Sequence, residues 1–141
     1  MIHPTFTPPA RCHHCEHEWT PRVTWRPVQC PKCKSTTWES KPNTWFIYAL
    51  IDPRTKQYFY VGKTRAPGMR FATHRAGMAY TAGRQVRNRC WELRQEGIAP
   101  LMVLIEEVPA DKSTVREHDW IRQLRDANEP ILNTHPMKRK P

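Results

Sequence analysis

The stretch Thr44–Lys63, TWFIYALIDPRTKQYFYVGK, decides the fold. Thr44–Ile51 and Gln57–Gly62 are rich in β-branched and aromatic residues, so each is predicted to be a strand. Between them Asp52–Lys56 forms a turn, with a proline suited to its second position. The two strands therefore make a hairpin that ends at Gly62, a residue that permits close approach of a ligand or a sharp change of direction.

Beyond the hairpin, helical patterns alternate with one more apolar run. Pro67–Met78 and Arg84–Glu96 are predicted to be helices. Leu101–Ile105 is a short continuous apolar stretch, which is typical of a buried strand. Ser113–Ala127 is a third helix that ends before a proline. The order strand, strand, helix, helix, strand, helix predicts one modest core after the polar joint near Ser40–Asn43.

Polar side chains recur at spacings that can bring them together. Arg70 and His74 are four residues apart on the first helix, so they share one face. On the last helix Glu117 falls on the same stripe as the core residues Ile121 and Leu124. A carboxylate in that position is costly unless it is paired or holds a metal.

On these residues the chain resembles the GIY-YIG nuclease superfamily. The matching pattern reads Phe46-Ile47-Tyr48, Tyr60-Val61-Gly62-Lys63-Thr64, Arg70-x3-His74, Glu117-x2-Trp120-Ile121 and Leu132-Asn133. Phe46 stands where the family has its first glycine, a structural position. The resemblance implies an α+β fold over residues 43–141, with a small three-stranded antiparallel sheet flanked by helices. It also implies that the protein hydrolyses DNA phosphodiester bonds as an endonuclease.

The resemblance gives the two hairpin tyrosines catalytic roles. Tyr48 would take the proton of the attacking water. Its pKa, near 10 for a free tyrosine, must then be lowered by positive charge, which Lys63 could help to supply. Tyr60 would be a second ligand for phosphate or water. The alternative for both tyrosines is aromatic packing in the sheet.

The remaining matching residues are implied to bind the phosphate and a metal. Arg70 would clamp the phosphate, since a guanidinium matches it bidentately, and His74 would assist near the scissile bond. Glu117 would be the protein ligand of a divalent ion, Mg²⁺ or Mn²⁺. Asn133 would brace the site with its carboxamide. A structural alternative for Glu117 is a capping box with Thr114 at the start of the last helix.

The N-terminal residues 1–42 carry two Cys-x-x-Cys pairs, Cys12/Cys15 and Cys30/Cys33, separated by fourteen residues. Two such pairs indicate a tetrahedral zinc site with four cysteine ligands. A segment of roughly 30 residues cannot bury enough apolar surface to fold unaided, so a structural Zn²⁺ would supply the missing stability. The segment resembles zinc ribbons. Nearby rival ligands, which a complete four-cysteine site does not need, are His13, His14 and His17.

The charge of the chain favours a polyanionic partner. The formal net charge is +10 and the pI is about 9.8, which makes nucleic acid the leading candidate. Basic residues of the ribbon that could contact DNA are Arg11, Arg22, Arg26, Lys32 and Lys34. Basic residues of the second helix that could follow the backbone are Arg84, Arg87, Arg89 and Arg94.

Other features limit the compartment and the class of protein. No run of 18 apolar residues occurs, so no membrane span is expected. Met1–Ala10 lacks a basic n-region and an apolar h-region, which argues against secretion and for a reducing, cytoplasmic location. There, paired cysteines hold metal more often than they form disulfides, and Cys90 is expected to be a buried unreactive thiol.

These observations predict a metal-dependent DNA endonuclease with an N-terminal zinc ribbon. One site per monomer cuts one strand, so the protein would act as a monomer or as a DNA-induced dimer. Two rival hypotheses remain open. One is a nucleic-acid-binding module on the same fold without activity, and the other is a zinc-ribbon adaptor that docks proteins.

Overall fold

The computed structural model describes residues 9–22 and 26–133, so Met1–Ala10 lies largely outside it. The helices and strands are β1 (Ala10–Arg11), β2 (Glu18–Trp19), β3 (Thr44–Asp52), β4 (Gln57–Thr64), α1 (Pro67–Arg75), the 3₁₀ turn η1 (Tyr80–Ala82), α2 (Arg84–Gln95), β5 (Leu101–Pro109), the 3₁₀ turn η2 (Ala110–Lys112) and α3 (Ser113–Asp126). Among them, no helix has both the length and the apolar character that crossing a bilayer requires.

The predicted hairpin forms the centre of the main sheet. β3 and β4 pair antiparallel, with Tyr48 opposite Gly62. β5 pairs antiparallel with the other side of β3, which gives the strand order β4-β3-β5. The predicted α+β fold with a three-stranded antiparallel sheet is therefore confirmed, and β4 is an edge strand of that sheet.

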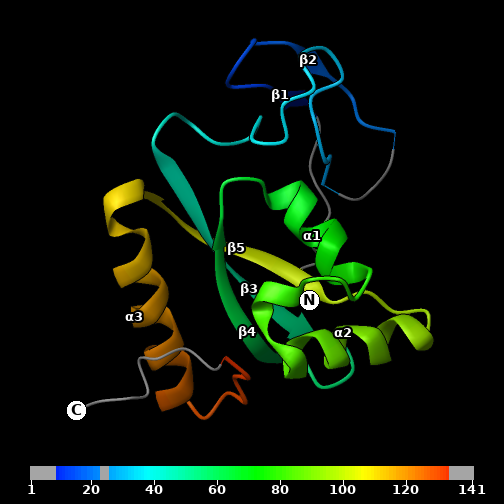
Figure 1. Cartoon of the computed structure of the whole chain (residues 1–141), viewed down its shortest axis with the longest axis vertical. Coiled ribbons are helices and arrows are strands. Elements are labelled where there is room, and N and C mark those ends of the chain that lie inside the picture. Colours follow the sequence, from blue (N-terminus) through cyan, green and yellow to red (C-terminus); the bar gives the residue numbers. More distant parts are fainter. Residues whose placement is uncertain (1–8, 23–25, 134–141) are drawn as a thin grey trace.

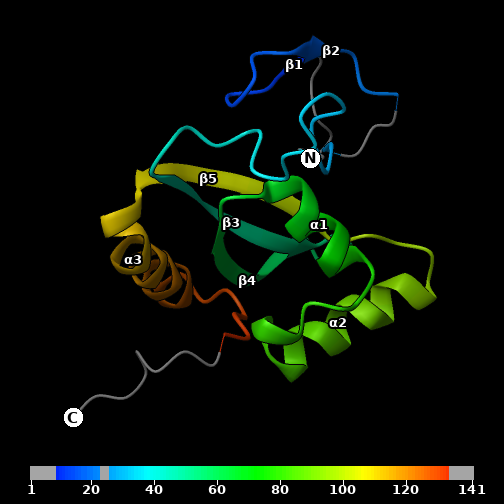
Figure 2. The same ribbon diagram turned by 45° about the horizontal axis from the view of Figure 1, so that its top comes forward.

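Each face of the sheet is covered by helices. On one face Leu50 of β3 packs in a buried cluster with Phe71 of α1, and α2 closes the same side. On the other face Ile121 of α3 packs in a cluster with Ile47 and Val61. Figures 1 and 2 show α3 on one side of the sheet and α1 with α2 on the other. The alternation of the strand residues produces this two-sided core.

A bulge changes the expected direction of one tyrosine. The register shifts between Leu50 and Ile51, so Leu50 pairs with Tyr60 and Ile51 with Tyr58, leaving Phe59 as the extra residue. Tyr58 therefore packs on the α3 face, whereas Tyr60 packs on the α1 and α2 face. Strict strand alternation over Gln57–Gly62 would put Tyr58 and Tyr60 on one face, and this expectation is wrong because one inserted residue inverts the alternation.

β5 is also longer than its apolar run predicts. It continues past Ile105 to Pro109 as the second edge strand. Glu106 lies in this extension and accepts hydrogen bonds from Trp120 Nε1 (2.9 Å) and from the Arg116 guanidinium (3.0 and 3.1 Å). An edge strand tolerates such polar residues, which a continuous apolar pattern cannot reveal.

The cysteine-rich segment packs directly on the start of α1. A Cβ added to Gly68 would lie 2.0 Å from the carbonyl oxygen of Pro27, so the two backbones are in close contact. Trp38 Nε1 donates to the same carbonyl (3.0 Å), and the buried hydroxyl of Ser40 donates to the carbonyl of Arg65 (2.5 Å). Figures 1 and 2 both place this segment at the same end of α1.

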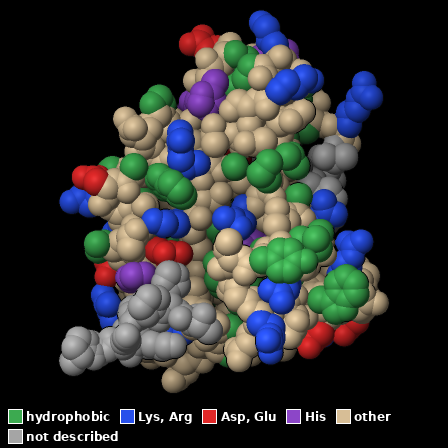
Figure 3. Space-filling model, in the orientation of Figure 1, with side chains coloured by type: hydrophobic (Ala, Val, Ile, Leu, Met, Phe, Trp, Pro, Cys, Tyr) green, Lys and Arg blue, Asp and Glu red, His purple; other side chains and the backbone are tan. Residues whose placement is uncertain are grey.

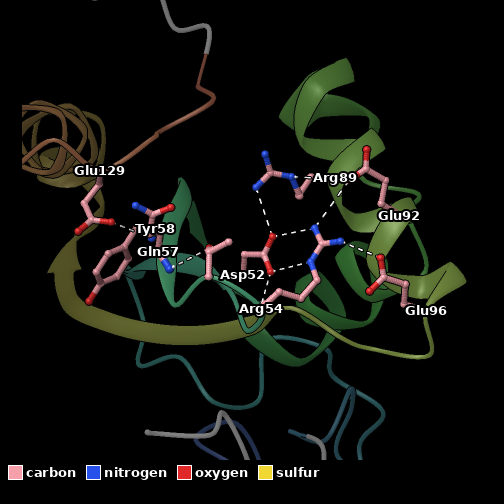
Figure 4. A network of polar contacts seen from close by, with 9 residues as sticks. Asp52, Arg54, Gln57, Tyr58, Arg89, Glu92, Glu96 and Glu129 are labelled. Carbon is pink, nitrogen blue, oxygen red and sulfur yellow. Dashed lines mark hydrogen bonds and ion pairs between the residues drawn. The ribbon is translucent and has the colours of Figure 1, made fainter.

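An ionic network around the buried Asp52 ties the hairpin turn to α2 (Figure 4). Asp52 is 1% exposed and accepts hydrogen bonds from Arg54 N (2.8 Å), Nε (3.0 Å) and Nη2 (2.8 Å). Arg89 of α2 lies 3.5 Å from the same carboxylate, and Arg54 reaches Glu96 at 2.9 Å. The hydrogen bonds from the Arg54 side chain outweigh burial and hold the pKa of Asp52 below its ordinary value.

We predict that Asp52→Asn lowers the free energy of unfolding at pH 7 by about 1–3 kcal/mol, because two arginines lose their buried counter-charge. The folded pKa of Asp52 is depressed, so its ionised form stabilises the fold fully above 3.8, its ordinary pKa. This stabilisation is lost as pH falls below 3.8 toward the folded pKa. Urea unfolding should therefore show a large difference between wild type and variant at pH 7 and a smaller one at pH 3.

The exposed Asp126 at the end of α3 is the control, since Asp126→Asn removes a carboxylate that is not buried and should leave the free energy of unfolding at pH 7 close to that of the wild type. An equal difference between wild type and Asp52→Asn at both pH values would show that the Asp52 charge does not stabilise the fold.

Candidate active site and metal centre

Three aromatic rings pack together beside Gly62. The ring centroids lie 6.0 Å apart for Tyr48 and Tyr60, 5.7 Å for Tyr48 and His74, and 5.5 Å for Tyr60 and His74. A Cβ on Gly62 would lie 2.6 Å from the Tyr48 hydroxyl oxygen and 2.8 Å from the Tyr60 ring. Glycine is therefore required here for space, because both phenols lie against the backbone of the edge strand.

Tyr48 is hydrogen-bonded to a neutral histidine. The Tyr48 hydroxyl lies 2.8 Å from His74 Nε2, and both residues are buried. Burial, and next to it the charge of Arg70, lowers the pKa of His74 to about 3, so at pH 7 its Nε2 can accept the phenol proton. The buried His74 Nδ1 has no hydrogen-bond partner in the described part of the chain.

The electrostatics of Tyr48 differ from the expectation. Burial raises the pKa of Tyr48 well above 10, the neighbouring Tyr60 acts in the same direction, and Arg70 acts in the opposite one. Burial likewise raises the pKa of Tyr60 to about 12. The expected lowering of the Tyr48 pKa was wrong for this state because desolvation outweighs the cation. Arg70, rather than Lys63, supplies the opposing positive charge.

Arg70 lies on α1 at the border between the core and solvent. Its side chain is half-buried, and Nη1 donates to the Thr81 hydroxyl at 3.4 Å. A pocket of about 350 Å³ lies between the end of β4 and α1. Its lining includes Lys63, Arg65 and Arg70, with Trp45 and Met69 among the others. This groove is basic and therefore suits an anion.

Glu117 enters the same cluster from α3. It is 5% exposed, and burial raises its pKa to about 7, while Lys63 acts in the opposite direction. Its charge raises the pKa of Tyr48 and of Tyr60, so the carboxyl group is within electrostatic reach of both phenols. A carboxylate is the donor type that Mg²⁺ takes together with waters and substrate phosphates, so the residue fits a divalent ion.

Lys63 links β4 to the start of α3. Its Nζ donates to Ser113 Oγ (3.1 Å) and Thr114 Oγ1 (2.7 Å) and lies 5.2 Å from the centroid of the Trp45 ring. α3 begins at Ser113 and has no side-chain capping hydrogen bond. The capping-box alternative for Glu117 was therefore wrong, because Thr114 lies inside the helix and its hydroxyl accepts from Lys63.

Asn133 holds the edge of the sheet instead of lining the groove. Its Nδ2 donates to the Val61 carbonyl (2.8 Å), and its Oδ1 accepts from the Val61 N–H (3.1 Å). The adjacent Leu132 N–H donates to the Phe59 carbonyl at 2.8 Å. The amide thus pairs with the open edge of β4 one residue before Gly62. Asn133 therefore supports the site indirectly, through hydrogen bonds to the backbone of β4.

The structure therefore brings six of the predicted site residues together and places the seventh, Asn133, at the strand edge. The set of six meets around the Tyr48 phenol and the basic groove: Tyr48, Tyr60, Lys63, Arg70, His74 and Glu117. Asn133 supports that set from the strand edge. Sequence reasoning missed Thr81, which contacts Arg70 from the connection between α1 and α2, because no local pattern signals such a contact.

The residues predicted to contact DNA differ in accessibility. Arg22, Lys32 and Arg84 are exposed, and the Arg87 guanidinium lies 4.6 Å from the centroid of the Tyr80 ring. Arg26 is only 16% exposed and pairs with Glu39, so its prediction as a surface contact is not supported. The half-buried Glu39 requires a counter-charge there.

The four N-terminal cysteines form one cluster. Their sulfur atoms all lie within 4.8 Å of one another, with 3.7 Å between Cys12 and Cys33 and 3.6 Å between Cys15 and Cys30. Sulfur ligands about 2.3 Å from a tetrahedral ion would lie about 3.8 Å apart. A disulfide would require about 2.05 Å. The spacing thus fits four ligands of one metal such as zinc.

Two of these sulfurs accept hydrogen bonds from backbone N–H groups. The N–H groups of His14 and Cys15 donate to Cys12 Sγ. Those of Lys32 and Cys33 donate to Cys30 Sγ. Burial raises the pKa of Cys30, but these backbone bonds and the neighbouring thiols outweigh it and lower that pKa to about 7.

Cys90 and the rival ligand His14 both lie outside the sulfur cluster. His14 Nε2 lies 2.9 Å from the Thr37 carbonyl oxygen and does not belong to the sulfur cluster. Cys90 is buried, and burial raises its pKa to about 12. A thiol in that environment is unreactive, as expected.

We predict that the intact protein carries one zinc ion and that the double variant Cys30→Ser, Cys33→Ser loses it. The described residues 9–22 and 26–42 should then unfold, because so short a segment has little core without the metal, while the β3–β4 hairpin stays ordered. Elemental analysis and amide hydrogen exchange measure both effects. Cys90→Ser is the control that should retain the metal. An intact protein without zinc would refute the assignment.

We also predict that Gly62→Ala displaces both phenols and lowers the free energy of unfolding by about 1–3 kcal/mol, because the methyl group overlaps the Tyr48 hydroxyl. NMR of the His74 ring should show that its hydrogen bond to Tyr48 is disturbed. Gly97→Ala is the matched control: Gly97 has a φ of +74° but nothing within 4 Å of an added Cβ. It should lose stability through backbone strain while the His74 signals stay unchanged.

A known domain family accounts for this arrangement. The model of the GIY-YIG catalytic domain matches residues 44–129, which is more than half of the chain and includes both hairpin strands and Glu117. No curated protein and no solved structure gives a significant match. The chain therefore belongs to the GIY-YIG family, whose domain is typical of endonucleases.

Proposed function

We propose that this protein is a divalent-metal-dependent DNA endonuclease. One observation carries the proposal. A buried phenol, a neutral histidine, a guanidinium and a buried carboxyl group converge from β3, α1 and α3 at the edge of β4. Phosphodiester hydrolysis needs a base for water and positive charge on the phosphate oxygens, and this cluster offers both kinds of group.

Tyr48 is the proposed acceptor of the proton from the attacking water. Its hydroxyl proton passes to His74 Nε2, 2.8 Å away, as the water proton passes to the phenol oxygen, so no phenolate has to accumulate. This relay fits the raised pKa of Tyr48, which otherwise makes a free phenolate costly. A phosphate bound beside Arg70 would favour the protonated imidazole through its negative charge.

Arg70 is the proposed phosphate ligand, and Lys63 adds positive charge at the same groove. Glu117 is the proposed protein ligand of Mg²⁺ or Mn²⁺. When bound, that ion would supply positive charge to the phosphate and the leaving oxygen. Tyr60 lies against both Tyr48 and His74 and is proposed to be a second ligand for the phosphate or the attacking water.

The ribbon is proposed to bind Zn²⁺ and to extend the DNA contact. Arg22 and Lys32 are exposed on it, and Arg84 is exposed on α2. Binding by such contacts should weaken steeply with salt, because phosphate neutralisation releases counter-ions. One cluster per chain cuts one strand, so we propose nicking by a monomer, or double-strand cleavage by a DNA-induced dimer.

We predict that the purified full chain nicks supercoiled plasmid with Mg²⁺, and that Tyr48→Phe lowers the rate by about 100- to 10,000-fold. Phenylalanine keeps the ring packing and removes only the hydroxyl. Tyr58→Phe on the same hairpin is the matched control, since Tyr58 packs on the opposite face. Its rate should remain that of the wild type.

Glu117→Gln should abolish the Mg²⁺-dependent nicking, by at least about 100-fold, while plasmid binding at low salt is kept. Binding without nicking by the wild type would instead identify an inactive nucleic-acid-binding module. Failure of the wild type to bind DNA at low salt would favour the protein-docking adaptor.

A further inference from the structure

We propose that Tyr80 and Arg87 form a stacking platform for an unpaired base of the strand being cut. The inference rests on the proposed function and names its substrate class: DNA that has an unpaired nucleotide beside the scissile phosphate. The platform lies on η1 and α2, outside the cluster of residues described above.

The Tyr80 ring has a cation against it and remains largely exposed. The Arg87 guanidinium lies 4.6 Å from the ring centroid, which is the geometry of a cation–π contact. Tyr80 is nevertheless 62% exposed, so most of its side chain stays open to solvent. An exposed ring that a cation holds in place can accept a base by stacking.

The platform is next to the phosphate ligand. Arg70 Nη1 donates to the hydroxyl of Thr81, and Thr81 directly follows Tyr80 in η1. The backbone of η1 therefore lies beside Arg70, so a strand whose phosphate binds at Arg70 would carry its neighbouring nucleotide along η1, where Tyr80 is exposed. In a fully paired duplex the bases are stacked inside the helix, so only an unpaired base can reach the ring at low cost.

Charge around the platform selects a polyanion over a protein. Residues 53–91 contain nine Lys or Arg and no Asp or Glu, and two of the nine, Arg54 and Arg89, pair with acidic residues outside this segment. Two more large hydrophobic side chains are exposed nearby in this acid-free segment, Met78 (51%) and Trp91 (52%). Figure 3 shows hydrophobic side chains alternating with Lys and Arg over the region of α1 and α2. Exposed rings among basic side chains are the pattern of single-strand contacts.

The test compares two oligonucleotides of one sequence, a paired duplex and the same duplex with a short unpaired bubble. 2-Aminopurine in the bubble reports stacking as a loss of fluorescence, with Ca²⁺ in place of Mg²⁺ so that binding is measured without cleavage. The wild type should bind the bubble more tightly and quench the probe. Tyr80→Leu should weaken bubble binding by about 5- to 150-fold, remove the quenching and leave duplex binding unchanged.

Two controls separate the ring from general effects. Tyr80→Phe keeps the ring and should behave as the wild type. Trp91→Leu removes an exposed ring on α2 that is not adjacent to the Arg70 contact, and it should keep the quenching. Equal binding of both DNAs by the wild type, or quenching that persists in Tyr80→Leu, would overturn the platform. So would self-association that Tyr80→Leu abolishes without any effect on DNA.

The proposed function fails separately from this inference. A wild type that quenches the bubble probe but cleaves neither DNA with Mg²⁺ supports the platform and refutes the endonuclease. A wild type that cleaves duplex and bubble equally, with no quenching, supports the endonuclease and refutes the platform.

Discussion

The missing side chain at Gly62 is the constraint on which the site depends. The phenol of Tyr48 reaches across from β3 and lies against this residue so closely that a methyl group would overlap it. That packing buries Tyr48 and His74, and burial keeps both of them neutral near pH 7. Because these two groups are uncharged, the cations Arg70 and Lys63 would dominate the electrostatic potential at a phosphate bound in the groove. The packing and the electrostatics of the site therefore have one origin.

Several acidic residues of the domain pair with arginines that do not line the groove. Around the hairpin turn, at the end of β3 where Asp52 lies, Arg54 pairs with Asp52, Glu92 and Glu96 (Figure 4). On the α3 side, Arg116 similarly pairs with Glu106 and Asp119. The groove, by contrast, is lined by the cations Lys63, Arg65 and Arg70. A field concentrated in this way steers a polyanion to the groove, beyond what the net charge alone would do.

Sequence reasoning predicted the features that repeat and missed those that depend on single contacts. The alternation of Thr44–Ile51 and the spacing of the cysteines are regular, so the hairpin and the sulfur cluster were predictable. The bulge at Phe59 that turns Tyr58 away was not, because one inserted residue leaves no mark in composition. The pairing of Arg26 with Glu39 was equally hidden, since an isolated arginine reads as surface whether or not an acid lies beside it. Burial of Tyr48 is a tertiary effect, which is why the direction of its pKa shift was mispredicted.

The cysteine segment and the active site meet in the first turn of α1. The polar joint after residue 40 suggests a loose tether, yet the Ser40 hydroxyl is buried on the carbonyl of Arg65 and Gly68 touches Pro27. Arg70 follows two residues after that contact. A bulkier residue at position 68 would push the segment and the helix apart, so the close approach itself fixes their relation. DNA held by both parts would meet a preorganised surface, because little freedom between them remains to be lost on binding. The cysteine segment is therefore a structural support of α1, the helix that carries the proposed phosphate ligand, as well as a proposed additional contact.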